Sequence, residues 1–262
     1  MSTIVNVVGP SFLSLPTRTA KPRRRGITHV LDNGLPVSQV APLLGVCGDY
    51  VDVWKLGWGT AYLDPGLADK LTLLAEHGVL ACAGGTLLEV AWQQGAVEAY
   101  LDWAAQVGFP CVEVSRGVAE MSLADKQAIV ERAAERFIVL AEVGSKDPLA
   151  EVGAQAWAGE AAGDLQAGAT WIVTEGRESG TVGLFTAGGE VRDDVVRAVV
   201  AAVGVGTTVF EAPRKEQQAW LIRRFGPDVN LANIAPADAL GVEALRLGLR
   251  ADTFDATARA RR

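Results

Sequence analysis

Charged side chains close several apolar runs of this sequence, and these residues have the chemistry that a reaction needs. The run RFIVLAEVGSKDP, from Arg136 to Pro148, stops in Glu142 and Lys146. The segment CVEVS carries Glu113 and Ser115 on the same side of an extended chain. Carboxylates are ligands for a hard divalent cation, and a lysine beside them is either an ion-pair partner or a proton donor. These residues indicate a site where a metal ion and a proton donor meet, with a plain ion pair as the alternative for Lys146.

Further apolar runs of strand length end in the same way. Their polar ends are Asp32 after ITHVL, Lys55 after YVDVW, the glycines Gly84 and Gly85 after GVLACA, Glu175 with Arg177 after TWIVT, Glu211 after TVF, and Asn233 in VNLAN. Runs that are apolar throughout suit strands covered on both faces, and Ala- and Leu-rich stretches of helix length separate them. Eight such units predict a single closed (β/α)8 barrel, an α/β fold whose polar strand ends line one mouth.

Glycines near two of these ends predict contact with an anion. Lys55 is followed by LGWGT, whose closely spaced glycines let the backbone approach a ligand while the lysine supplies positive charge. Gly85 opens a helix, so the free amides there could meet an oxyanion. Asn233 closes the eighth run, and barrels commonly bind phosphate in the loops after strands seven and eight. The Asn233 loop and the Lys55 loop therefore compete for a phosphate.

The remaining acids each allow two interpretations. Asp32 either binds the metal or caps the next helix, and the sequence favours neither. The loop TEGRESG holds Glu175, Arg177 and Glu178 within four residues, which indicates a mixed metal and anion site. Glu211 is either a ligand or a salt-bridge partner.

Length and composition predict one domain that acts on a small molecule. The chain has 262 residues, of which 49% are hydrophobic, and about 250 residues is typical of a barrel. Residues 1–25 are predicted to form an N-terminal arm and residues 26–262 the catalytic barrel. The formal net charge of -7 argues against a nucleic-acid partner, and no stretch is long and uncharged enough for a membrane. Three cysteines without metal-ligand spacing predict reduced thiols in a cytoplasmic protein.

A series of segments resembles, in order, the motifs of the phosphosulfolactate synthase family. These segments are GITHVLDNGLP, CGDYVDVWKLGWGT, GGTLLE, VEVSRG, AEVGSKD, EGRESG, FEAPRKEQQ, FGPDVNLANI and LRLGLRADTF. The resemblance covers nearly the whole chain from about Gly26. It implies a (β/α)8 barrel in a compact homotrimer that uses Mg²⁺ to add sulfite to phosphoenolpyruvate. The implied product is (2R)-phosphosulfolactate, an intermediate toward coenzyme M in methanogens.

The resemblance also implies roles for individual residues. Lys146 matches the lysine that the family's mechanism uses as general acid, and Lys55 and Arg177 would hold the phosphate or the carboxylate. The predicted site has Lys146, Arg177 and Glu142 as catalytic residues, Glu113, Glu142, Glu175 and Asp32 as metal ligands, and Lys55, Ser115, Gly85, Asn233 and Arg116 as substrate contacts.

Asn33, Arg116 and Ser145 depart from the family's motifs. Asn33 and Ser145 stand where the family usually has lysines, and Arg116 replaces an acid. Sulfite is a small dianion, so changed charges at the mouth could admit a different nucleophile. Two alternatives therefore stay open: an enzyme that adds another nucleophile to phosphoenolpyruvate or a related enol phosphate, and a non-catalytic, stress-associated family member.

Overall fold

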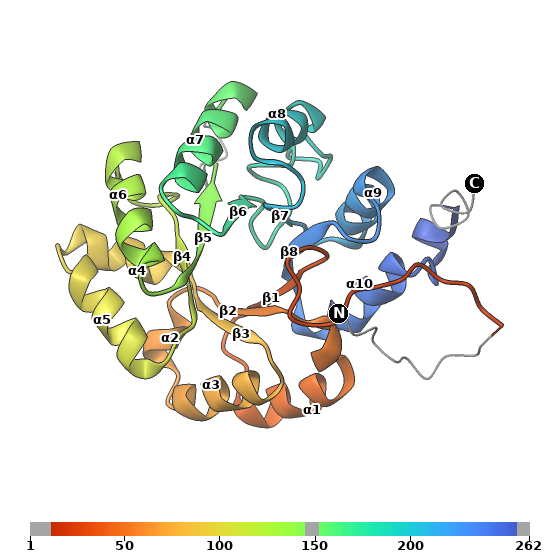
Figure 1. The fold of residues 1–262 in the computed structure, drawn as a ribbon, viewed down its shortest axis with the longest axis horizontal. Helices are drawn as coiled ribbons and strands as arrows, with labels where there is room; N and C mark the ends of the chain where they lie inside the picture. The colour runs from red at the N-terminus through yellow and green to blue at the C-terminus, as the bar shows by residue number, and fades with distance from the viewer. Residues whose placement is uncertain (1–11, 145–151, 256–262) are drawn as a thin grey trace.

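The chain folds into a closed barrel of parallel strands, which confirms the predicted (β/α)8 fold. The computed structural model describes residues 12–144 and 152–255. The strands are β1 (Thr28–Asp32), β2 (Val53–Leu56), β3 (Leu80–Ala83), β4 (Cys111–Val114), β5 (Ile138–Val143), β6 (Trp171–Thr174), β7 (Thr208–Glu211) and β8 (Asn230–Ile234). Each strand pairs in parallel with the next one along the chain, and β8 pairs with β1 to close the ring (Figure 1).

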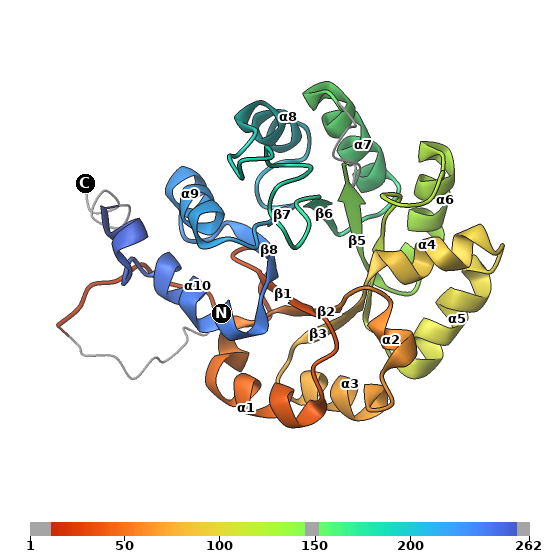
Figure 2. The ribbon, with the colours of Figure 1, turned by 180° about the vertical axis from the view of Figure 1, so that it is seen from behind.

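Helices surround the barrel because an amphipathic stretch follows each strand (Figures 1 and 2). They are α1 (Val37–Cys47), α2 (Thr60–Leu63), α3 (Leu67–Glu76), α4 (Gly85–Gln93), α5 (Val97–Val107), α6 (Leu123–Ala134), α7 (Ala154–Gln166), α8 (Asp193–Val203), α9 (Lys215–Phe225) and α10 (Ala239–Arg246). Helix α10 ends at Arg246, and Gly248 adopts a left-handed φ of 69° soon after it. None of the helices within residues 12–144 and 152–255 is long and apolar enough to cross a membrane.

The inside of the barrel holds an apolar layer, which is two residues deep on β6 (Trp171 and Val173), and a polar layer above it. In a strand, residues two apart face the same side, so Val53 lies below Lys55 and Val209 lies below Glu211. The lower layer is apolar, and the layer above it holds the polar strand ends. The lower layer consists of Ile27, Val53, Cys82, Cys111, Leu140, Trp171, Val173, Val209 and Ala232. Cys82 and Cys111 are buried free thiols, as predicted from their spacing.

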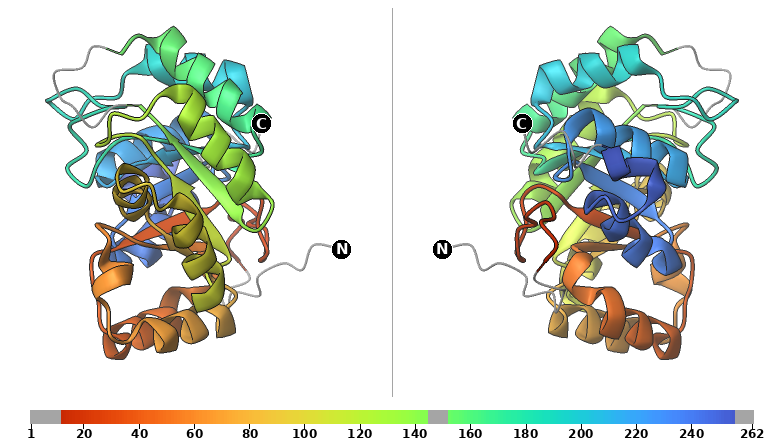
Figure 3. Two further views of the ribbon diagram at one scale, coloured as in Figure 1. Left: turned by 90° about the vertical axis from the view of Figure 1, so that its left-hand side faces the viewer. Right: turned by 90° about the vertical axis from the view of Figure 1, so that its right-hand side faces the viewer.

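The segment before β1 packs against the end of the barrel opposite the polar layer. Arg18 forms ion pairs with Asp228 (2.7 Å) and Glu243 (2.9 Å), and Arg23 forms one with Asp52 (3.1 Å). Asp52 directly precedes β2 and Asp228 lies two residues before β8, so these contacts lie at the amino-terminal ends of the strands. In Figure 3 this segment, drawn in red, lies at the other end of the barrel from the loop between β6 and α8.

A buried lysine joins β5 to helices α6 and α7. Lys126 is fully buried, and its Nζ donates to the main-chain oxygen of Glu142 (2.6 Å), to Glu160 (2.7 Å) and to Asp164 (2.5 Å). A buried ammonium is stable only when such acceptors surround it. The lysine therefore fixes the end of β5, where Glu142 enters the polar layer.

We expect Lys126→Met to lower the free energy of unfolding by about 3–5 kcal/mol, because it removes the cation that pairs with buried Asp164 and one of the two cations that pair with Glu160. Chemical denaturation measures the change. Arg132→Met on the same helix is the control, because its ion pair with Glu98 is exposed and contributes about 0–1 kcal/mol. Equal losses in the two variants would contradict a structural role for the Lys126 cluster.

Candidate active site

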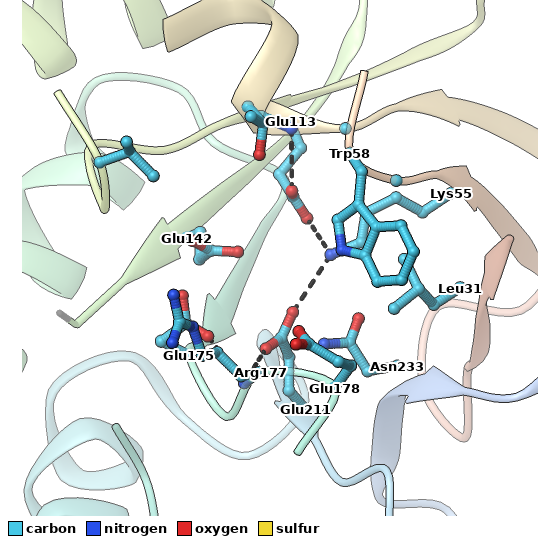
Figure 4. A pocket seen from close by; sticks show the side chains of 15 residues that line it. Leu31, Lys55, Trp58, Glu113, Glu142, Glu175, Arg177, Glu178, Glu211 and Asn233 are labelled. Atoms are coloured by element: carbon cyan, nitrogen blue, oxygen red, sulfur yellow. Dashed lines mark hydrogen bonds and ion pairs between the residues drawn. The ribbon is translucent and has the colours of Figure 1, made fainter. Parts of the chain in front are cut away.

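The polar layer opens into a cavity of about 250 Å³ at the carboxyl-terminal ends of the strands (Figure 4). This is the end of a (β/α)8 barrel where active sites are found. A residue at or next to the end of each strand lines the cavity: Leu31, Lys55, Gly84, Glu113, Glu142, Glu175, Glu211 and Asn233. Gly57, Trp58, Gly85, Thr86, Val118, Arg177 and Glu178 complete the lining.

Three buried glutamates meet in this cavity. Glu113, Glu142 and Glu211 each bring one carboxylate oxygen within 4.8 Å of those of the other two, and such a group fits a divalent metal ion. Lys55 lies beside them, with its Nζ 2.9 Å from Glu113 Oε2 and 3.1 Å from Glu211 Oε1 (Figure 4). The cavity thus combines a cluster of negative charge with one buried cation.

Main-chain amides hold the second oxygen of two of these carboxylates. The amide of Gly85, at the start of α4, donates to Glu113 Oε1 (3.0 Å). The amides of Gly176 and Arg177, after β6, donate to Glu211 Oε2 at 2.8 Å and 3.0 Å. Two carboxylates are therefore anchored from behind. The amide of Gly85, predicted to meet an oxyanion, is instead engaged by Glu113.

The charges in the cavity shift one another's pKa. Burial by itself lowers the pKa of Lys55, but Glu113, Glu211 and Glu142 outweigh burial and raise it well above 10.5. Burial raises the pKa of Glu113 above 4.5, and repulsion from Glu142 and Glu211 adds to this although Lys55 opposes it. Lys55 therefore stays charged at every physiological pH.

Unusual backbone conformations gather around the cavity. Among the described non-glycine residues, Trp58 (φ 54°), Arg177 (φ 54°) and Asn233 (φ 55°) adopt positive φ, and all three line the cavity. Side chains other than glycine rarely adopt this region, and such conformations persist only where the surrounding structure imposes them. The surrounding structure therefore holds these three residues in fixed conformations around the cavity.

Asn233 and His29 are buried polar side chains with hydrogen-bonding atoms that have no partner among the described residues. Asn233 is 6% exposed, and its Oδ1 has no hydrogen-bond partner in the part of the chain that the structure describes. His29, inside β1, is fully buried, and neither ring nitrogen has a partner among the described residues. Burial and the positive charge of Lys55 lower the pKa of His29 well below 6.5, so the imidazole is neutral. Of Asn233 and His29, only Asn233 lines the cavity.

The prediction that Asp32 is a metal ligand does not fit the structure. Asp32 is fully buried and does not line the cavity, because it points outward from β1 toward α3. Its Oδ1 accepts from the amides of Gly34 and Leu35, and its Oδ2 from Trp54 Nε1 (2.9 Å) and Lys70 Nζ (3.1 Å). Its Oδ1 therefore holds the turn before α1, which is close to the alternative of a cap, and its Oδ2 joins β1 to β2 and α3.

Ser115 and Arg116, predicted to contact the substrate, do not line the cavity either. Ser115 donates to Glu89, which also accepts from the amides of residues 117–119 and so fixes that loop. Arg116 makes two hydrogen bonds to Glu160, at 3.1 Å and 3.0 Å. The arginine that replaces an acid of the family's motif is therefore neutralised outside the cavity.

The structure brings Glu211 into the site, although the sequence left it as either a ligand or a salt-bridge partner. The sequence feature that could have identified Glu211 as a site residue is its position at the end of an apolar run, a feature that Glu113 and Glu142 share. Glu175 lines the cavity but is not part of the three-glutamate group. Lys146 and Ser145 lie outside the described residues, so the role predicted for Lys146 stays a prediction.

These features define a (β/α)8-barrel enzyme with an acidic, metal-compatible cavity at its carboxyl-terminal mouth. The model of the family described as (2R)-phospho-3-sulfolactate synthase (ComA) matches residues 16–252. The chain belongs to this phosphosulfolactate synthase family, and the resemblance of its motifs is confirmed.

Proteins that are similar in sequence agree with this assignment. The chain is 38% identical to phosphosulfolactate synthase of Bacillus subtilis (strain 168) over 92% of its length and 97% of the relative. It is 40% identical to phosphosulfolactate synthase of Methanocaldococcus jannaschii, over 88% of the chain and 94% of the relative. Protein HEAT-STRESS-ASSOCIATED 32 of Arabidopsis thaliana is 24% identical over 84% of the chain and 86% of that relative. A 3-hexulose-6-phosphate synthase structure, 17% identical with a TM-score of 0.55 over 84% of this chain and 99% of that one, shares the barrel fold.

We expect Gly85→Ala to lower the free energy of unfolding by about 1–3 kcal/mol. A Cβ at Gly85 would collide with the Ser115 side chain and would lie 3.3 Å from Glu113 Oε1, so the glutamate must move. Gly159→Ala in α7 is the control, because its Cβ would meet nothing within 4 Å and alanine favours a helix. Equal stability of the two variants in denaturant unfolding would show that α4 does not pack tightly against Glu113.

Proposed function

We propose that this protein adds sulfite to phosphoenolpyruvate, with Mg²⁺ as cofactor, to give phosphosulfolactate. One observation carries the proposal: the three glutamates share a cavity with Lys55 and Arg177. Ligands for a divalent cation and for an anionic substrate therefore lie side by side. Membership of the phosphosulfolactate synthase family supports this choice of substrates.

The donor atoms suit Mg²⁺. Glu113, Glu142 and Glu211 offer carboxylate oxygens, which are the hard ligands that Mg²⁺ prefers. Asn233 adds a neutral oxygen that is buried and has no hydrogen-bond partner among the described residues, and Glu175 stays a proposed ligand. A divalent cation held there would neutralise the substrate carboxylate and stabilise the charge that builds up on it during addition.

The cations of the cavity bind the remaining charge of the substrate. Lys55 comes from the end of β2 and Arg177 from the loop after β6, so they approach from different sides of the cavity. We assign the phosphate and the carboxylate of phosphoenolpyruvate to these two residues. Trp58 and Val118 line the same cavity and limit the access of water.

In the proposed reaction the sulfur lone pair of sulfite forms a bond to C3 of phosphoenolpyruvate. The electron pair of the double bond moves toward C2 and the carboxylate, and a proton then adds at C2. Lys146 is the proposed proton donor, on the basis of its match to the family's general acid. No covalent bond to the protein forms, and catalysis depends on charges fixed in place before the reaction.

The environment of Arg116 supports sulfite as the nucleophile. Glu160 neutralises the charge of Arg116, and Arg116 does not line the cavity. This departure from the family's motif therefore adds no charge to the cavity. A separate prediction, implied by the resemblance to the family, is that the chain forms a homotrimer.

An assay of phosphoenolpyruvate consumption tests the proposed function. The purified protein is given Mg²⁺ and phosphoenolpyruvate with sulfite, and then with a panel of thiols, while products are identified by mass. We expect phosphosulfolactate with sulfite and no product after chelation of the metal. A product only with another nucleophile would replace sulfite in the proposal. The absence of a product with every nucleophile would favour a non-catalytic protein.

We expect Lys146→Ala to reduce kcat by about 10²–10⁴-fold while phosphoenolpyruvate still binds, because the variant removes the proton donor but not Lys55 or Arg177. Steady-state kinetics and calorimetry of phosphoenolpyruvate binding measure the two effects. Lys215→Ala is the control, because Lys215 pairs with Glu216 and Asp252 on the surface. Unchanged turnover in Lys146→Ala would remove Lys146 from its assigned role.

A further inference from the structure

Lys55 contacts the oxygens that the proposed metal site would use. Its Nζ lies 2.9 Å from Glu113 Oε2 and 3.1 Å from Glu211 Oε1, and its charge also acts on Glu142. These carboxylates are the three that form the metal-compatible group. Main-chain amides engage the other oxygen of Glu113 and of Glu211, so the ammonium and a divalent cation would need the same oxygens of these two glutamates.

Main-chain amides hold the two carboxylates independently of Lys55. Their other oxygens are held by main-chain amides, Glu113 Oε1 by Gly85 and Glu211 Oε2 by Gly176 and Arg177. Amides at the start of a helix and in a loop with an imposed left-handed residue do not move with the lysine. The oxygens on the Lys55 side thus remain aimed into the cavity when the lysine turns away.

Charge repulsion and the adjacent cavity both favour movement of Lys55 away from the glutamates when a cation enters. Its ammonium lies within 3.1 Å of both Glu113 and Glu211, so a divalent cation that enters the cluster meets a positive charge at close range and repels it. Its flexible stem ends beside a cavity of about 250 Å³ that it lines together with Arg177. An ammonium released from the glutamates would lie where the proposed substrate carries its negative charge.

We propose that Lys55 couples the two binding steps: it occupies Glu113 and Glu211 until a divalent cation binds, and then moves to the anionic group of the substrate. The inference rests on the proposed metal and substrate sites. It makes the metal bind more weakly than the glutamates alone would allow, and it makes metal binding strengthen substrate binding. Two ligands that share one residue in this way show reciprocal coupling.

Calorimetry on the intact protein tests this coupling without using turnover. For Lys55→Met we expect Mg²⁺ alone to bind at least about tenfold more tightly than in the wild type, because one repelling charge is gone. We expect phosphoenolpyruvate, titrated at saturating Mg²⁺, to bind at least about tenfold more weakly. Lys55→Gln, which keeps a hydrogen-bonding head group without the charge, should shift both affinities in the same directions if Lys55→Met does not fold.

Two further variants separate this role from a purely structural one. Lys55→Arg keeps the charge, so its Mg²⁺ affinity should stay within about twofold of the wild type. Lys70→Met removes a buried lysine that pairs with Asp32 and Asp64 outside the cavity, so it should lower stability but leave Mg²⁺ affinity unchanged.

Equal or weaker Mg²⁺ binding in folded Lys55→Met or Lys55→Gln overturns the inference, and so does a lack of Mg²⁺ binding in both the wild type and these variants. The proposed function can fail separately: a wild type that binds Mg²⁺ and phosphoenolpyruvate with the expected coupling but does not use sulfite would refute the reaction and keep the role of Lys55.

Discussion

The ion pairs of Lys55 are the interaction on which the mouth of this barrel depends. Glu113, Glu142 and Glu211 place like charges within 4.8 Å of one another in a buried layer. Such an arrangement costs several kcal/mol unless opposite charge and hydrogen bonds compensate it. Lys55 supplies the charge, and amides after β3 and β6 supply hydrogen bonds. With one ammonium and three carboxylates the cluster retains a charge that a divalent cation would balance.

Buried ion pairs outside the barrel support this cluster from behind. Lys126 holds the main-chain oxygen of Glu142 between α6 and α7, and Lys70 holds Asp32 at the turn after β1. Glu89 of α4 accepts hydrogen bonds from the amides of residues 117–119. Buried pairs of this kind contribute little net stability compared with apolar side chains, but they fix position. A site that binds a metal and a small anion needs such fixed positions more than it needs extra stability.

Much of the fold was predictable from the chain itself. The eight apolar runs with their polar ends correspond to the eight observed strands, because a strand covered on both faces needs an apolar sequence and must stop where polar groups meet water. The polar ends predicted Lys55, Glu113, Glu142, Glu175, Arg177 and Asn233, and all of them line the cavity.

Asp32 and Glu211 show what only the tertiary structure decided. In the chain both are acids at the end of an apolar run, but Asp32 points outward to Lys70 while Glu211 points inward to Lys55. A strand buried on both faces carries no alternation of polar and apolar residues, so the sequence does not reveal which face an end residue takes. Barrel closure sets that face for each strand and thereby selects the acids that share the cavity. The sequence by itself determined the fold and the kinds of group at its mouth, and the closed barrel determined which of them meet.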